Sequence, residues 1–207
     1  MAEHKRFSRP FLLWFLLLFS MLMVCTVAGC SATPTPKVRD FRIDKLLIDV
    51  SVFPPGWYVY QDPKRYGEDR AQEDDRYIEF RSMEDAATHS MHIVFQYRDD
   101  GAAAYWYAEY LPAEFESAFR LTPWETSDDL QYHSQVADQF RFACADFQFT
   151  DGDSKRYTRC TAMGQYDEYV SVFFTYVSSD SITYADLERI LKTIDERMAY
   201  YLERESK

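Results

Sequence analysis

The sequence predicts an α+β domain in which one antiparallel sheet is covered by two or three helices. Three observations predict it. Polar and apolar residues alternate over 77–82 and 91–97, as in strands with one buried face. Two further strand-like segments flank a glycine-centred turn at 151–153. An amphipathic helix closes the chain. These elements fall within residues 40–207, which is the length of a single domain with a real core.

The first elements of this domain are a short helix and a strand. Apolar residues recur at helical spacing over 41–50, which predicts a helix there: Ile43, Leu46, Leu47 and Val50. Residues 53–57, Phe-Pro-Pro-Gly-Trp, end that helix, and 57–60 read as the first strand. The polar stretch 61–76 predicts a solvated loop. Calcium binding by its carboxylates is the alternative, but the spacing of these residues matches no known calcium-binding loop.

Two strands and a helix follow. Strands are expected at 77–82 and 91–97, with a loop between them. Asp99 or Asp100 caps a helix that continues through Ala102 and is interrupted near Pro112, because proline lacks the amide hydrogen. Its inner face comprises Ala103, Trp106, Tyr107, Tyr110 and Leu111. Residues 121–137 are expected to form an excursion with short strands around Trp124 and Tyr132.

A hairpin after residue 138 has a register that the sequence itself specifies. Cys144 and Cys160 are equidistant from Gly152, so a hairpin that turns there places them directly opposite each other. Their Cα atoms would be about 4.5 Å apart, within the reach of a disulfide. The same register sets Phe142 against Ala162 and Phe140 against Gly164, a large residue against a small one. The apolar segment 169–177 is then expected in the middle of the sheet.

The last element is an amphipathic helix. Thr183 is its expected N-cap, and Asp186 completes a capping box three residues later. Its apolar stripe is predicted to cover the sheet: Leu187, Ile190, Leu191, Ile194, Met198, Tyr201 and Leu202. The polar residues are expected to face water: Glu188, Arg189, Lys192, Asp195 and Glu196.

The first thirty residues form a separate segment. Three basic residues precede an apolar run over 11–24, which is typical of a secretory leader. Residues 27–30, Val-Ala-Gly-Cys, follow it, and this order resembles the lipobox of bacterial lipoproteins. The resemblance implies cleavage after Gly29, which leaves Cys30 as a lipidated N-terminus and residues 1–29 as the removed signal peptide. An uncleaved membrane helix is the alternative. The basic head places the rest of the chain outside the cytoplasm in both cases.

The expected mature chain begins with a tether and is strongly acidic. Residues 30–39 hold the lipidated cysteine and a stretch with two prolines, which keeps the domain off the bilayer. Residues 1–29 contain three of the 23 basic and one of the 34 acidic residues, so 20 basic and 33 acidic residues remain, a net charge of −13. That charge argues against nucleic acid as a partner. The expected partners are the membrane, through the lipid on Cys30, and a protein or glycan of the cell envelope.

No pattern typical of catalysis or of a cofactor stands out in residues 30–207. Three histidines remain there, and His89 and His92 fall on opposite faces of a strand. No metal site, cofactor or catalytic residue is therefore predicted. Cys144 and Cys160 are expected to be bonded, because disulfides persist outside the cytoplasm. The tryptophans Trp57, Trp106 and Trp124 are the candidates for a ligand surface, with core packing as the other role for at least two of them.

The domain layout is similar to that of small extracytoplasmic lipoprotein domains of the broad PsbP-like kind. The resemblance lies in the turn at 53–57, the alanine-rich helix and the final strands and helix. It implies a sheet covered by helices, and no functional residue is carried over from it. The expected function is that of a lipid-anchored interaction or binding module. A small-ligand or glycan-binding protein is the second reading, and an enzyme is the third.

Overall fold

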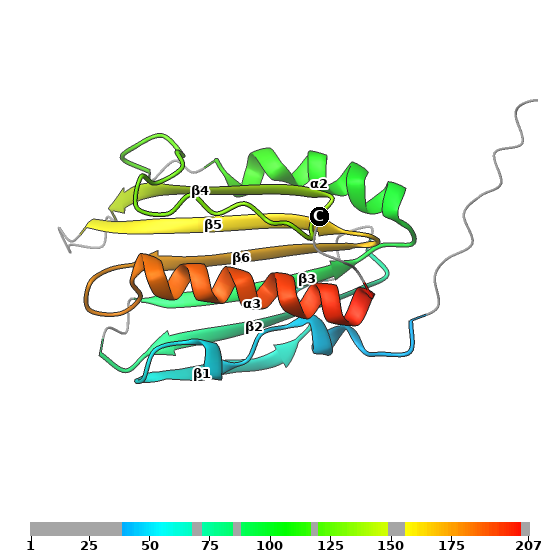
Figure 1. Cartoon of the computed structure of the whole chain (residues 1–207), viewed down its shortest axis with the longest axis horizontal. Coiled ribbons are helices and arrows are strands. Elements are labelled where there is room, and N and C mark those ends of the chain that lie inside the picture. The colour runs from blue at the N-terminus through cyan, green and yellow to red at the C-terminus, as the bar shows by residue number, and fades with distance from the viewer. Residues whose placement is uncertain (1–38, 68–71, 85–87, 117–119, 149–155, 204–207) are drawn as a thin grey trace, which may run out of the picture. The chain divides into compact units, whose positions relative to one another are not determined.

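The fold is built on a six-stranded antiparallel sheet with the order β1-β2-β3-β6-β5-β4 (Figure 1). The computed structural model describes residues 39–67, 72–84, 88–116, 120–148 and 156–203. The strands are β1 (Trp57–Lys64), β2 (Asp74–Ser82), β3 (His89–Gln96), β4 (Gln139–Gln148), β5 (Arg156–Tyr166) and β6 (Tyr169–Val177). The predicted α+β class with one antiparallel sheet is confirmed, and the apolar strand β6 lies in its middle.

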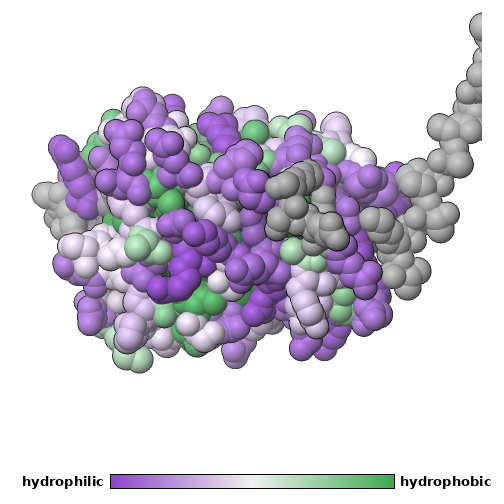
Figure 2. Space-filling model, viewed as in Figure 1, coloured by the Kyte–Doolittle hydropathy of each residue, from purple (hydrophilic) through white to green (hydrophobic). Residues whose placement is uncertain are grey.

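Two helices cover opposite faces of this sheet. α2 (Asp100–Glu114) packs on one face and α3 (Tyr184–Leu202) on the other (Figure 1). Successive side chains of a strand point to opposite faces, so Ile93 and Phe95 join the cluster under α2, whereas Val94 joins the cluster under α3. The sheet is thus apolar on both sides, and the domain has two clusters of buried residues. Hydrophilic side chains dominate the outer surface around α3 (Figure 2).

The hairpin register is confirmed. Cys144 pairs with Cys160, Phe142 with Ala162, and Phe140 with Gly164. A disulfide joins the two cysteines, whose Cα atoms are 4.0 Å apart. The predicted turn at Gly152 lies outside the described residues.

α3 follows its sequence pattern. The side chain of Thr183 accepts a hydrogen bond from the amide of Asp186, whose carboxylate accepts one from the amide of Thr183. All predicted stripe residues are buried except Tyr201, which is half-buried. The helix is therefore the lid of the larger core cluster. α2 begins after Asp99, whose carboxylate accepts from the amide of Ala102 at 2.7 Å.

The predicted helix over 41–50 is wrong. Two 3₁₀ turns, η1 (Ile43–Leu46) and η2 (Val50–Val52), flank an extended stretch. Residues Leu46, Leu47 and Ile48 are buried in succession, which one face of a helix cannot achieve. The extended backbone turns the amide of Ile48 toward Nδ1 of His92, 3.2 Å away. A buried hydrogen bond from the sheet thus replaces one within a helix.

The predictions for 61–76 and 121–137 also need correction. β1 continues to Lys64 and β2 starts at Asp74, so the expected loop is shorter. The carboxylate of Asp75 is fully buried and accepts from the amides of Tyr66 and Gly67, which organises that connection. Between 121 and 137 there is no strand in the described structure, and only isolated bridges occur, such as that of Glu125 with Cys144. Trp124 and Tyr132 therefore lie in irregular backbone.

Candidate functional site

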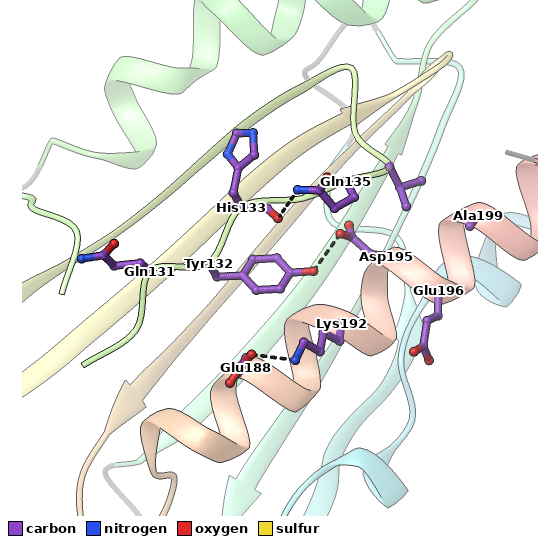
Figure 3. Close-up of a pocket in the computed structure, with 10 residues that line it drawn as sticks. Gln131, Tyr132, His133, Gln135, Glu188, Lys192, Asp195, Glu196 and Ala199 are labelled. Atoms are coloured by element: carbon purple, nitrogen blue, oxygen red, sulfur yellow. Dashed lines mark hydrogen bonds and ion pairs between the residues drawn. The ribbon is translucent and has the colours of Figure 1, made fainter. Parts of the chain in front are cut away.

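A pocket of about 610 Å³ opens between α3 and the irregular segment 131–136 (Figure 3). The side chains around it are mainly amides, charged groups and one tyrosine. They are Gln131, Tyr132, His133, Gln135, Val136, Glu188, Lys192, Asp195, Glu196 and Ala199. The pocket thus has one wall on a regular helix and one wall on a chain segment whose shape must be fixed by side chains.

The helical wall follows from the spacing of α3. Glu188, Lys192 and Glu196 are four residues apart, so they line one edge of the helix. Nζ of Lys192 lies 2.6 Å from Oε1 of Glu188 (Figure 3). Both side chains are largely exposed, so this ion pair contributes little to stability and its groups remain available to a partner.

The irregular wall is held by a buried carboxylate. Oδ1 of Asp195 accepts hydrogen bonds from the hydroxyls of Ser134 at 2.8 Å and Tyr166 at 2.7 Å. Oδ2 accepts from the hydroxyl of Tyr132 at 2.7 Å (Figure 3). The sequence pattern placed Asp195 in water, and this prediction is wrong, because the residue is only 6% exposed. Three hydroxyl donors replace the water that the carboxylate loses.

Ser134 transmits this anchor to the backbone. Its Oγ donates to Asp195 and also accepts from the amides of Val136 at 3.2 Å and Ala137 at 2.9 Å. Three hydrogen bonds therefore bend the segment 134–137 and tie it to α3. Nothing in the local sequence of α3 indicates this, since the partners of Asp195 lie 29 to 63 residues away.

The tyrosines of the network stay protonated. Burial, and then the hydrogen bond to Asp195, raises the pKa of Tyr132. Burial, and then the charge of Asp195, raises the pKa of Tyr166 well above its usual value. Deprotonating either phenol would set two anions side by side in a region with little water. The two hydroxyls therefore act as permanent donors.

The hydroxyl of Ser134 is not free for nucleophilic attack. Nucleophilic catalysis needs a hydroxyl oxygen that is free to attack and a base that can take its proton. Oγ of Ser134 already makes three hydrogen bonds. His133 lines the pocket, but its ring points away from Asp195 and packs edge-on against Phe140, with 6.1 Å between ring centroids (Figure 3).

The structure does not bring the three predicted tryptophans together. Trp57 is buried and stacks on Phe53 at 5.0 Å, so it offers no face to a ligand. Trp106 and Trp124 are half-buried and belong to the cluster under α2, on the other side of the sheet. Trp106 stacks on Tyr110 at 5.1 Å, and Trp124 packs edge-on against Phe115 at 5.3 Å. None of the three lines the pocket beside α3.

The other predicted sites have different outcomes. The Cys144–Cys160 disulfide is present, and both residues are buried under the α3 side of the sheet. Cys30 lies outside the described residues. Within those residues, no group of three or more His, Cys, Asp or Glu side chains is arranged to hold a metal ion. None of the described helices is long and apolar enough to cross a membrane.

In comparisons with known proteins, no family model matches this chain, and no curated protein matches it at a significant level.

Proposed function

We propose that the protein is a lipid-anchored binding module of the bacterial cell envelope, held on the outer side of a membrane by Cys30. The lipobox at 27–30 supports the anchor and the location. The pocket beside α3 supports binding, and one observation carries this part of the proposal. The polar groups around Asp195 at the base of the pocket are hydrogen-bonded to one another, whereas the charged groups at the rim of the pocket remain exposed.

That combination is typical of a recognition surface. A buried network that satisfies itself fixes the shape of the pocket without presenting a reactive group. Exposed rim charges such as Glu188 and Lys192 then set which partner fits, by complementary charge. A protein segment of the envelope with both charge signs is the partner class that we propose for this pocket.

Labelling with a radioactive fatty acid tests the anchor. The wild-type chain should incorporate the label, and Cys30→Ala should remain an unlabelled precursor. Cys25→Ala is the matched control, because Cys25 lies close to Cys30 in the sequence but outside the lipobox. Equal labelling of wild type and Cys30→Ala would contradict the proposed anchor.

Site-specific crosslinking tests the pocket. A photo-reactive residue at Gln135, exposed at the pocket, should give a discrete adduct in intact cells. The double reversal Glu188→Lys and Lys192→Glu should abolish that adduct. The same probe at Tyr105, which is exposed on α2, should give none. Equal adducts at both positions, or an adduct that survives the reversal, would contradict binding at the pocket.

A glycan-binding function is the second candidate, and α2 carries the observation that favours it. Tyr105 is 61% exposed, and its neighbour Trp106 lies edge-on at 5.1 Å and is itself stacked on Tyr110. Aromatic faces of this kind pack on sugar rings. Purified peptidoglycan should then retain the wild type and release Tyr105→Ala/Trp106→Ala, with Tyr200→Ala on α3 as the exposed control.

A further inference from the structure

Arg39, the first described residue, is clamped to the turn between β5 and β6. Its Nε lies 2.6 Å from Oε1 of Glu168, and its Nη2 lies 2.8 Å from Oε2 of Glu168 and 2.9 Å from Oδ2 of Asp167. The hydrogen bond and charge of Glu168 raise the pKa of Arg39, despite partial burial. A bidentate arginine–carboxylate contact of this kind fixes the orientation of the arginine as well as its position.

The turn that receives Arg39 is itself braced. Asp167 has a left-handed backbone, with φ of 52°. Its amide donates to Oδ2 of Asp138 at 3.0 Å, and the carbonyl of Glu168 accepts from the amide of Tyr97 at 2.8 Å. The clamp therefore joins residue 39 to the body of the sheet at this end.

The same end of the domain carries the C-terminus of α3. Phe41 packs between Tyr169 at 6.3 Å and Tyr201 at 5.2 Å, so the start of the described chain, the start of β6 and the end of α3 lie together (Figure 1). Tyr200 is 76% exposed there. The side chain of Arg42 is 80% exposed, and Lys45 is exposed as well.

The opposite end of the sheet is marked by Met83. It follows β2 directly, and its amide donates to the carbonyl of Gly56 just before β1. It is 73% exposed, nearly as much as Tyr200. The nine residues of β6 separate the two ends by roughly 27 Å along the strands.

We propose that the Arg39 clamp orients the domain end-on, with the β5–β6 turn and the C-terminus of α3 toward the bilayer and Met83 away from it. This rests on the proposed lipid at Cys30. Eight residues, 31–38, lie between Cys30 and Arg39, so the nine steps from one Cα atom to the next can span at most about 32 Å. Because the clamp fixes residue 39 at the end of the sheet that bears Tyr200, this is the end that we expect near the membrane. Exposed tyrosine, lysine and arginine are the side chains that suit the interface between lipid and water.

Energy transfer to the bilayer tests this orientation. The full-length protein, isolated with its lipid and placed in phosphatidylcholine vesicles that hold a lipid-attached acceptor, would be labelled at Met83→Cys or Tyr200→Cys. The two positions have matched exposure, and the native cysteines Cys144 and Cys160 are bonded. Transfer from position 200 should exceed transfer from position 83 at least twofold.

The clamp is tested by neutralising Arg39 together with Glu168, its more buried carboxylate partner. In the double variant Arg39→Gln/Glu168→Gln, the difference in energy transfer between positions 200 and 83 should shrink toward zero. Arg42→Gln removes an exposed cation at the same end and should keep the difference. Equal transfer in the wild type, or a full difference in the double variant, would overturn the proposed orientation.

One further measurement separates this proposal from the one on which it rests. The mass of the same isolated protein shows whether Cys30 carries its lipid. Lipid on Cys30 with equal transfer from both positions contradicts the orientation alone. Protein without lipid that fails to bind the vesicles contradicts the proposed anchor, and the orientation is then overturned with it.

Discussion

The hydroxyl of Tyr166 at the end of β5 donates to Oδ1 of Asp195 on α3, 2.7 Å away. Both residues are buried, and Oδ1 accepts from Ser134 as well. This contact joins the sheet, the lid helix and the irregular segment at one carboxylate. It makes the pocket beside α3 depend on a single side chain.

Replacing Asp195 with Asn should lower the free energy of unfolding by roughly 2–4 kcal/mol, because hydroxyl donors then face a neutral amide. Chemical denaturation measures this. Glu196→Gln changes the exposed neighbour and should stay within about 0.5 kcal/mol of the wild type. Similar losses of unfolding free energy in both variants would mean that the buried network around Asp195 does not stabilise the fold.

His92 should make stability depend on pH in a defined window. It is fully buried between the amide of Ile48 and the hydroxyl of Ser171, and burial lowers its pKa from 6.5 to about 3. Below pH 6.5 this histidine is therefore protonated in the unfolded chain but stays neutral in the folded chain. The contribution of His92 to the free energy of unfolding is fully present above pH 6.5. It is lost as the pH falls toward 3, by up to about 1.4 kcal/mol per pH unit.

A comparison of slopes checks the assignment to His92. Denaturation midpoints of the wild type and His92→Asn, measured from pH 7 to pH 4.5, should fall more steeply for the wild type. The exposed His133 provides the control, since His133→Asn should keep the wild-type slope. Parallel curves for the wild type and His92→Asn would assign the pH dependence to other groups.

Loss of the disulfide should destabilise the hairpin that it crosses. Cys144→Ser/Cys160→Ser frees a loop with a sequence separation of 16, which costs roughly 3 kcal/mol in the chain-entropy model. Thermal unfolding with and without a reductant measures the same loss in the wild type. Non-reduced peptide mass spectrometry should find the two cysteines linked, and free thiols on both would contradict the bond.

The stripe of α3 should be a core element. Leu191 is 2% exposed, so Leu191→Ala should cost roughly 2–5 kcal/mol. Lys192→Ala, on the adjacent exposed position, is the matched control and should change stability by less than about 0.5 kcal/mol. A loss below that value for Leu191→Ala would mean that the stripe is not buried in solution.

The elements that sequence predicts well here are those specified by local pattern. The hairpin register follows from the equal spacing of Cys144 and Cys160 about one glycine, and α3 follows from its cap and its stripe. Both depend on residues that are close in the sequence, or on one period sustained over many residues. Local pattern alone was therefore sufficient for them.

What the sequence missed depends on distant contacts. The spacing of Ile43, Leu46 and Leu47 suits a helix, but the acceptor on His92, 44 residues from Ile48, favours an extended chain. Asp195 occupies a polar position of α3 and is buried only because hydroxyls from two other segments converge on it. The pocket is also beyond a local pattern, because its two walls, 131–136 and α3, are far apart in the sequence.

The intact mass of the protein purified from membranes would show directly whether Cys30 is the lipid anchor. We expect a chain that begins at Cys30 and carries a diacylglycerol thioether on its sulfur, with or without a further acyl chain on the new amino group. A chain that retains residues 1–29, or one that begins elsewhere with an unmodified Cys30, would contradict it.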